Sequence, residues 1–447
     1  MGSFVPSTLE ERKEMLEAVG VKSYDELYKD VPESIRLGEN GLKLEDGVSE
    51  LEALSKMEAL AEKNHAFKAV FRGAGSYHHY IPAIVKRVTS KEQFLTAYTP
   101  YQAEISQGVL QSIFEYQTLI CRLTGMDTAN ASVYDGASAA AEAAAMCRDR
   151  KRHRVLVSGA VNPQVIETVK TYAWGVLSIE ENLAHPDHLV TVLSPEDGRT
   201  DPEQLRAALT PDTACVIVQQ PNFYGQLEDI EAIAKVTHEA GAKLIVSVNP
   251  IAAAVLKTPR ELGADIAIGE GQPLGMPMGF GGPYLGFMAA TKDMMRKLPG
   301  RIVGETIDSQ GRRCYVLTLQ AREQHIRREK ASSNICSNEA LCAMTAAAYL
   351  EAMGPKGLQD TAILCASKAH YLASELAKIG YKALNKGEFF HEFVTACPSE
   401  EAIRRLQEAD ILPGLPIEGG MLWCATELCT KEQMDKAVRI IKEVEGR

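Results

Sequence analysis

Short apolar runs alternate with helix-like patterns through the middle of the chain. The runs are rich in Val and Ile, each ends in polar or turn-forming residues, and they span 154–161, 213–221, 242–250 and 264–271. Helical spacing of apolar residues, as in LEDIEAIAKVTHEAGA, lies between them. Near-continuous apolar strands that alternate with helices are typical of a parallel sheet covered on both faces. Ligands of such sheets bind at the carboxyl ends of the strands.

The N-terminal part of the chain has a different pattern. Residues 1–65 carry Glu, Lys and Leu at helical spacing, which predicts an arm of surface helices wrapping a larger body. The first helix has Ser7 or Thr8 as its N-cap, and Glu10 or Glu11 closes a capping box.

The pattern shifts again towards the C-terminus. A large α/β domain is predicted over residues 66–335 and a smaller α/β domain over 336–447. The smaller domain is expected to contain an Ala-rich helix at 338–354, strands in HEFVTACP and MLWCATEL, and helices in SEEAIRRLQEA and KEQMDKAVRIIKEV.

Composition narrows the classes of function. The chain has 447 residues and a formal net charge of −11, which argues against a nucleic-acid binder or a binder of anionic membranes. It has no apolar run long enough to cross a bilayer and no secretory signal pattern at its N-terminus. The cysteines show no CxxC spacing, so no metal site is expected, and scattered thiols favour a reducing cytoplasm.

The first candidate site is the start of the Ala-rich segment 130–150. Asp135, Gly136, Ala137 and Ser138 open a helix whose bare N-terminal backbone suits a phosphate group. An ordinary N-cap with small residues for close packing explains the same pattern and is favoured on this motif alone.

Two further candidates lie just past predicted strands. Asn162 and Asn249 each follow a buried strand, although Asn is also a common turn residue at such places. The glycine-rich stretch GEGQPLGMPMGFGGP (269–283) permits close approach of a ligand to the backbone. Because it lacks Lys, His and Asp, a structural loop is the favoured interpretation.

Polar residues mixed with tyrosines form another candidate. YHHYIP (77–82) is followed by YTPYQAEISQG (98–108), which is dense in hydroxyl, amide and carboxylate groups. A site or an interface and an exposed polar loop are equally supported here. The basic cluster within 313–336 is favoured as a solvated charge run over an anion or partner site.

Taken together, these segments resemble one family over essentially the whole chain. YTPYQAEISQGVLQSIFEYQTLICRLTGMDTANASVYDGASAAAEA, GMPMGFGGPYLGF and REQHIRREKASSNICSNEAL are similar to signatures of the glycine-cleavage P-protein, the decarboxylating glycine dehydrogenase. The length matches the N-terminal half of the long single-chain form and resembles the α subunit of the two-subunit bacterial form.

The resemblance implies an aminotransferase-like fold of the fold-type-I class that binds pyridoxal 5'-phosphate (PLP). The family uses PLP to decarboxylate glycine and passes the aminomethyl group to the lipoyl arm of the H-protein. Such a site requires a Schiff-base lysine, a carboxylate at the pyridine nitrogen and a ring that stacks on the cofactor.

The resemblance places uncharged amides at all three of these positions. Gln272 stands where the lysine is expected, Asn249 where the carboxylate is expected, and Asn162 where related sequences have a stacking histidine. An amide nitrogen is not a nucleophile, and a neutral amide does not stabilise a pyridinium. No cofactor is therefore expected to bind covalently to this chain.

The α-subunit resemblance implies a homologous β subunit that carries PLP and the lysine. Active sites of this fold class lie at dimer interfaces, so this chain is expected to contribute pocket or interface residues. The candidates are Tyr98, Thr99, Tyr101, Gln102 and Glu104, followed by Ser76, Tyr77 and His78.

Two alternatives stay open. The chain could be a self-sufficient PLP enzyme that uses another lysine, of which Lys257, Lys292 and Lys330 are nearest to the glycine-rich run. It could also be a structural or regulatory partner that contributes no group to an active site.

Overall fold

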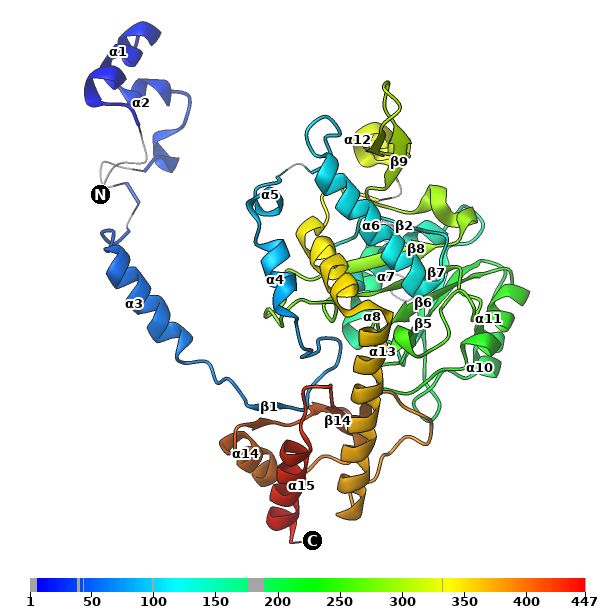
Figure 1. Ribbon diagram of the computed structural model, residues 1–447. Helices are drawn as coiled ribbons and strands as arrows, with labels where there is room; N and C mark the ends of the chain where they lie inside the picture. Colours follow the sequence, from blue (N-terminus) through cyan, green and yellow to red (C-terminus); the bar gives the residue numbers. More distant parts are fainter. Residues whose placement is uncertain are drawn as a thin grey trace. The chain divides into compact units, whose positions relative to one another are not determined.

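The computed structural model describes residues 6–37, 41–42, 44–98, 100–175, 189–331 and 333–446. The chain divides into two compact units, Met1–Ala66 and Phe67–Arg447 (Figure 1). The expected division into three parts, with boundaries after residues 65 and 335, stays a prediction.

The first unit consists of short helices without a core of their own. Its helices are α1 (Leu9–Val19), α2 (Tyr24–Leu27), a 3-10 turn η1 (Glu33–Ile35) and α3 (Glu50–Ala61), and none of them has a buried residue. Thr8 and Glu11 form the capping box expected for α1, and Ser49 and Glu52 form another at α3.

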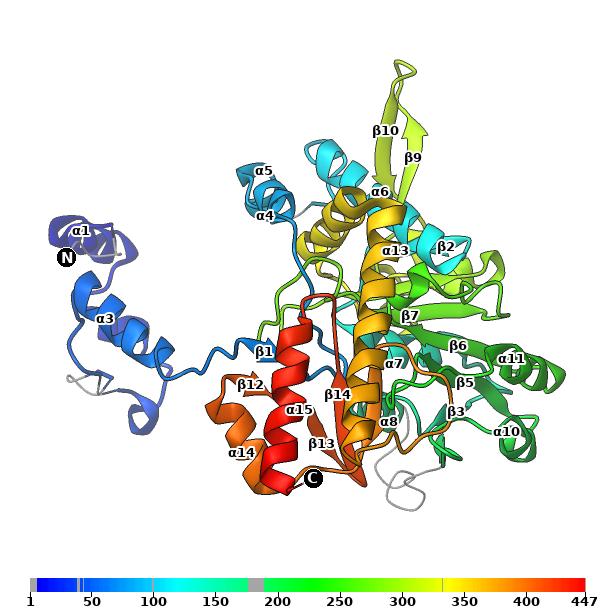
Figure 2. The ribbon, with the colours of Figure 1, turned by 60° about the horizontal axis from the view of Figure 1, so that its bottom comes forward.

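A seven-stranded sheet forms the centre of the second unit, in the order β2-β8-β7-β6-β5-β3-β4 (Figure 2). The strands are β2 (Thr128–Ala129), β3 (Arg154–Ser158), β4 (Val190–Leu193), β5 (Thr213–Gln220), β6 (Lys243–Val248), β7 (Ile266–Glu270) and β8 (Gly286–Ala290). The strands from β4 to β7 pair in parallel, whereas β8 is antiparallel to both of its neighbours. The expected strands and the mostly parallel sheet are confirmed.

Helices cover both faces of this sheet. As a result, successive residues of a strand are buried in two different cores, one on each face. Val216 and Val218 of β5 belong to one core, whereas Cys215 and Ile217 belong to the other. The first core also receives α6 (Gln107–Thr124), α11 (Ile230–Glu239) and α13 (Ala340–Lys378). The second receives α7 (Gly136–Cys147) and α8 (Pro163–Trp174). Helix α10 (Pro202–Ala208) contacts α11.

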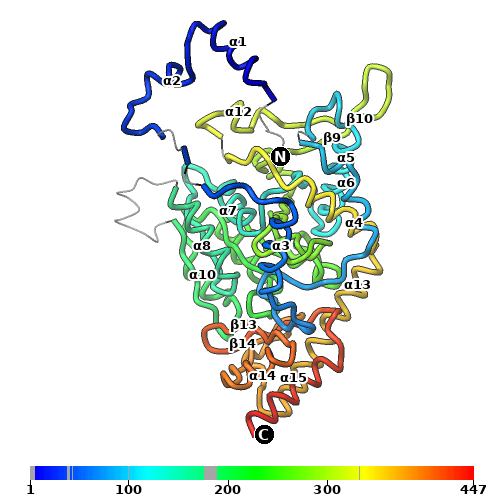
Figure 3. Tube along the Cα trace, turned by 90° about the vertical axis from the view of Figure 1, so that its left-hand side faces the viewer, coloured from blue at the N-terminus to red at the C-terminus, as the bar shows by residue number. Residues whose placement is uncertain are grey.

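The C-terminal elements surround a third core. An antiparallel sheet in the order β11-β14-β13 is formed by β11 (Glu392–Thr395), β13 (Leu415–Ile417) and β14 (Gly420–Cys424). Strand β1 (Ala69–Val70) pairs in parallel with β12 (Ile411–Leu412). Helices α14 (Glu400–Glu408) and α15 (Lys431–Glu445) lie with these strands at one end of the unit (Figure 3).

Shorter elements complete the second unit. They are α4 (Ala83–Thr89), α5 (Glu92–Leu95), η2 (Ala252–Ala254), η3 (Lys292–Lys297), the hairpin of β9 (Val303–Ile307) and β10 (Arg313–Leu317), η4 (Gln320–Arg322), α12 (Gln324–Arg327) and η5 (Arg328–Lys330). Within the described part of the chain, no helix is both long and apolar enough to cross a membrane.

Helix α13 differs from the expectation of a helix that ends at residue 354. Gly354 has φ 61° and ψ 176°, which interrupts the helix, and Pro355 begins a second helical segment that continues to Lys378. Proline lacks a backbone N–H and is well suited to the first turn of a helix. The first helical segment therefore ends at Gly354, as the sequence predicts. The second segment, which begins at Pro355, was not predicted from the sequence.

The contact of Gly225 with β11 provides a test of this packing. Gly225 has φ +84°, and an added Cβ would lie 1.9 Å from the carbonyl oxygen of Glu392. We expect Gly225→Ala to lower the free energy of unfolding by more than about 3 kcal/mol, because backbone must move. Gly311→Ala is the control, since Gly311 has φ +77° with open space around it, and should cost about 1 kcal/mol. Urea denaturation measures the free energy of unfolding of both variants. An equal decrease in the two variants would contradict the close contact between Gly225 and Glu392.

Candidate functional site

A cavity of about 410 Å³ lies at the carboxyl ends of the parallel strands. Its walls come from the ends of β5, β6 and β7, from the N-terminal parts of α7 and α8, from residues 73–77, from the glycine-rich stretch and from β11. The lining side chains with polar groups are Ser76, Tyr77, Asp135, Ser138, Asn162, Gln164, Thr168, Gln219, Ser247, Asn249, Glu270, Tyr284, His391 and Glu392. None of the described residues that line the cavity is a lysine or an arginine.

Gln272 lies beside this cavity, with 1% of its surface exposed. Its Oε1 accepts from the Tyr77 N–H at 2.9 Å, and its Nε2 donates to the Tyr77 carbonyl at 2.9 Å and the Met276 carbonyl at 2.8 Å. Both N–H groups of the amide are therefore engaged, and the side chain joins residue 77 to the glycine-rich loop.

The other two amides at the strand ends are also held by backbone groups. Asn162 accepts from the Gln164 N–H at 2.9 Å and donates to the Ala74 carbonyl at 3.0 Å. Asn249 accepts from the N–H groups of Ile251 and Ala252 at 2.9 and 3.1 Å. Both residues line the cavity, and both also act as local caps. Their assignment to a former cofactor site stays a prediction.

The N-terminus of α7 faces the cavity through Asp135, Gly136, Ala137 and Ser138. The Asp135 carboxylate accepts from the Ser138 N–H at 2.7 Å, which is an ordinary N-cap. The Gly136 N–H donates to Glu270 Oε2 at 2.9 Å. Two of the backbone donors expected for a phosphate thus already bond to carboxylates of the chain.

Two carboxyl groups in the cavity have strongly raised pKa values. Burial raises the pKa of Glu270 to about 7, although it accepts N–H groups from Gly136, Gln272 and Leu285. Burial likewise raises the pKa of Glu392 to about 7, while the Ala74 N–H and the Tyr77 hydroxyl donate to it at 2.6 and 2.8 Å.

A histidine and a tyrosine lie beside Glu392. Burial lowers the pKa of His391 to about 3, so its ring is neutral at pH 7. Neither ring nitrogen of His391 has a hydrogen-bond partner among the described residues. Burial, and after it the Glu392 carboxylate, raises the pKa of Tyr77 well above its usual value.

Sequence reasoning did not identify Glu270, His391 or Glu392 as site residues. Glu270 lies in the glycine-rich stretch itself, and an acidic residue directly after a buried strand was the available signal. His391 and Glu392 come from the C-terminal part of the chain and reach the cavity through tertiary packing, for which the sequence carried no local signal.

The expected interface residues fall into two groups. Ser76 and Tyr77 line the cavity, and the Ser76 hydroxyl lies 3.0 Å from that of Tyr284. The His78 side chain is exposed, and its carbonyl accepts from the Thr426 hydroxyl at 2.7 Å.

The second group, around residues 98–104, does not line this cavity. Tyr98 is 96% exposed, and Gln102 and Glu104 are also exposed. Tyr101 is partly buried, donates to Asn338 Oδ1 and lies under the Arg301 guanidinium, 5.5 Å from the ring centroid. Thr99 lies outside the described residues.

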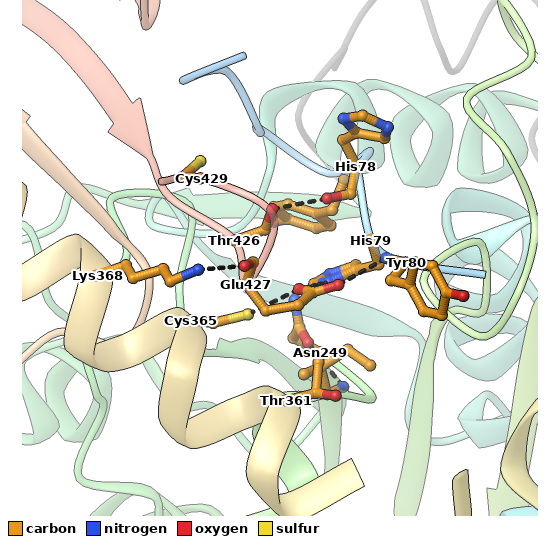
Figure 4. Close-up of polar contacts among 12 residues, drawn as sticks. His78, His79, Tyr80, Asn249, Thr361, Cys365, Lys368, Thr426, Glu427 and Cys429 are labelled. Atoms are coloured by element: carbon orange, nitrogen blue, oxygen red, sulfur yellow. Dashed lines mark hydrogen bonds and ion pairs between the residues drawn. The ribbon is translucent and has the colours of Figure 1, made fainter. Parts of the chain in front are cut away.

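One cluster among the described residues combines metal-ligand types. Atoms of His79, Cys365 and Glu427 lie within 4.8 Å of one another (Figure 4). Glu427 Oε2 contacts His79 Nδ1 at 2.7 Å and accepts from Cys365 Sγ at 3.3 Å, and its Oε1 accepts from the Tyr80 N–H at 2.6 Å. Each of these contacts uses an atom that could otherwise bind a metal, and together they connect residues 79–80 to the loop after β14. The expectation of no metal site stays a prediction.

The chain is similar to known proteins over most of its length. A family model described as "Glycine cleavage system P-protein" matches residues 2–440. A relative from Carboxydothermus hydrogenoformans, named "Probable glycine dehydrogenase (decarboxylating) subunit 1", is 47% identical over 449 residues, with 98% of this chain and 99% of the relative covered.

Solved structures agree with this similarity. A crystal structure of an inhibitor-bound glycine decarboxylase (P-protein) of the glycine cleavage system matches with a TM-score of 0.88 and 41% identity, covering 99% of this chain and 100% of that chain. The sphingosine-1-phosphate lyase of Burkholderia pseudomallei matches with a TM-score of 0.65 and 14% identity, covering 91% and 92%. The fold is therefore that of the fold-type-I PLP-dependent enzymes, as expected.

The raised pKa of Glu392 predicts how its replacement changes stability with pH. A carboxyl group whose pKa rises from 4.5 to about 7 on folding gives stability that is complete below pH 4.5 and is lost as the pH rises through 7. Glu392→Gln removes this loss and keeps an acceptor and a donor. Relative to the unchanged protein, the variant should therefore gain roughly 1–3 kcal/mol of unfolding free energy between pH 4.5 and 8.

Urea denaturation at pH 4.5, 6 and 8 measures this difference. Glu418→Gln, at an exposed position, is the control and should show no such trend. A difference between Glu392→Gln and the unchanged protein that stays constant across these pH values would contradict a buried, proton-holding Glu392.

Proposed function

The chain belongs to the family of glycine cleavage system P-proteins, and from this premise we propose that it acts as subunit 1 of a heteromeric glycine dehydrogenase (decarboxylating). In this role it carries no Schiff-base chemistry of its own. The observation that carries the proposal is Gln272, a buried amide bonded to backbone at the strand end of a PLP-enzyme fold, beside a cavity lined by no described lysine.

The residues of this cavity do not fit PLP. Gln272 offers an amide nitrogen, which is not nucleophilic, and both of its N–H groups are already used. Asn249 is uncharged and its oxygen caps two backbone N–H groups. We therefore assign the cofactor and its lysine to a homologous second subunit, with glycine as the substrate of the assembly and the lipoyl group of the H-protein as acceptor.

The segment 98–104 is the surface that we assign to the pocket of the second subunit. Tyr98, Gln102 and Glu104 are exposed, so they are available to a partner. Tyr101 is held by Asn338 and Arg301, which fixes the backbone that presents its neighbours. Rigid presentation of polar groups is what a contributed pocket residue requires.

The N-terminal helices, taken as a unit by themselves, expose apolar side chains. The side chains that are more than half exposed include those of Leu9, Met15, Val19, Leu51, Leu54, Met57 and Leu60. Apolar surface of this extent is typical of a contact with a protein surface.

The ten cysteines are free, which supports a reducing compartment such as the cytoplasm.

The lysines considered as alternatives receive less support. Lys257 is exposed and paired with Glu231 at 2.7 Å, and Lys292 and Lys330 are exposed. None of the three lines the cavity. A borohydride-reducible absorption band above ~400 nm in the isolated chain would support a self-sufficient PLP enzyme.

Co-expression with a homologous lysine-bearing chain tests the proposed subunit role. We expect the two chains to co-purify and to catalyse glycine-dependent exchange of labelled CO₂, and each chain alone to be inactive. The physical reason is that the amine and the neighbouring pocket residues lie on different chains. Exchange by this chain alone at the rate of the complex would overturn the proposal.

Replacement of Tyr101 and Glu104 tests whether this chain contributes residues to an active-site pocket or acts only as a structural partner. In the reconstituted complex, Tyr101→Phe with Glu104→Ala should lower CO₂ exchange at least tenfold, about 1.4 kcal/mol in the barrier, while co-purification persists. Glu432→Ala, at an exposed position of α15, is the control and should leave exchange unchanged. Normal exchange by the double variant in an intact complex would favour a purely structural partner.

A further inference from the structure

The start of α7 has the features of an anion site. The helix has twelve residues, and its N-terminal N–H groups and the positive end of its dipole face the cavity. Gly136 permits an unusually close approach here, since an added Cβ would lie 2.9 Å from the backbone nitrogen of Glu270 and 2.9 Å from its Cβ. The end of β7 is thus pressed against the end of the helix.

This approach brings a carboxylate into the anion position. Glu270 Oε2 accepts from the Gly136 N–H at 2.9 Å. Its Oε1 accepts from the N–H groups of Gln272 and Leu285 at 2.9 and 3.1 Å. The carboxylate is therefore held by three backbone donors from three places in the chain, which is the kind of donor set that holds a bound anion.

The other ionisable side chains of the cavity offer an anion no cationic partner. Asp135 and Glu392 are carboxyl groups, the His391 ring is neutral, and no described lysine or arginine lines the cavity. A phosphate dianion that entered the cavity would meet three carboxyl groups and a helix end whose first N–H is already taken. Repulsion between like charges is stronger beside the protein interior than in bulk water.

We propose that the Glu270 carboxyl group fills the cradle at the N-terminus of α7, which we define as the N–H groups of Gly136, Gln272 and Leu285. By taking the place of an external anion, it closes this cavity to PLP and to other phosphate-bearing ligands. Without a lysine at position 272, the chain cannot form a covalent bond to the cofactor. Glu270 in addition occupies the N–H groups that would bind the phosphate group of the cofactor. The isolated chain suffices to test this role, whatever its partner.

Equilibrium dialysis with labelled inorganic phosphate tests the occupied cradle. The unchanged chain should show no saturable binding at millimolar phosphate. Glu270→Ala vacates the cradle and should bind phosphate at least tenfold more tightly than the unchanged chain. Glu270→Ser, whose hydroxyl can still accept from Gln272 or Leu285, should bind likewise and keeps the test available where the alanine variant does not fold.

Two comparisons make the result specific to the cradle. Glu392→Gln removes a carboxylate from the same cavity away from α7 and should change phosphate binding less than about threefold. PLP and pyridoxal, followed by quenching of intrinsic fluorescence, should differ as ligands: the Glu270 variants should gain affinity for PLP and not for pyridoxal.

Three results would overturn the proposal. The first is phosphate or PLP binding by the unchanged chain with the affinity of the Glu270 variants. The second is a folded Glu270→Ser variant, checked by circular dichroism and its thermal midpoint, that gains no phosphate binding. The third is an equal gain from Glu392→Gln, which would assign the effect to the charge of the cavity as a whole.

Discussion

The side-chain amide of Gln272 joins two segments that are 195 residues apart in sequence, and the walls of the cavity depend on it. The amide accepts from the N–H and donates to the carbonyl of Tyr77, as a neighbouring β-strand would. Its second N–H fixes the loop at Met276. Buried backbone groups left without partners are costly, so this amide determines where residues 73–80 lie.

From Tyr77 the constraint extends to the C-terminal part of the chain. The Tyr77 hydroxyl donates to Glu392 on β11, and the Ala74 N–H donates to the same carboxyl group. On the other side of Tyr77, Glu427 holds the Tyr80 N–H and the His79 ring. The segment from 73 to 80 is therefore held between two acidic side chains from the C-terminal part and the amides of Gln272 and Asn162, which follow strands of the large sheet.

The regular elements could be predicted from sequence because their signals are local. Runs of Val and Ile bounded by turn residues marked β3, β5, β6 and β7, and capping residues marked α1. The three amides could also be placed at strand ends. The hydrogen bonds of Gln272 could not, because its partner Tyr77 is distant in sequence and its contact depends on how β7 and β11 flank the same segment.

The roles of the acidic groups were equally inaccessible to pattern reasoning. Glu270 is one residue among glycines, and only the position of β7 against α7 brings its carboxylate to the Gly136 N–H. In the sequence, Glu392 is an ordinary residue of a strand. Its role depends on the Tyr77 hydroxyl and the Ala74 N–H, which donate to its carboxyl group in the folded chain. Residues 98–104 stand out by composition alone, and composition does not indicate what such a surface contacts.

The same contacts explain why a lysine in place of Gln272 would not by itself recreate a cofactor site. A lysine has donors and no acceptor, so the Tyr77 N–H would lose the partner that Oε1 provides. Its ammonium group would instead meet the carbonyl groups of Tyr77 and Met276, which accept from Nε2 of Gln272. Hydrogen bonds from the ammonium group favour the protonated amine, and a protonated amine is not a nucleophile. The backbone contacts that suit an amide at position 272 therefore oppose a reactive lysine there.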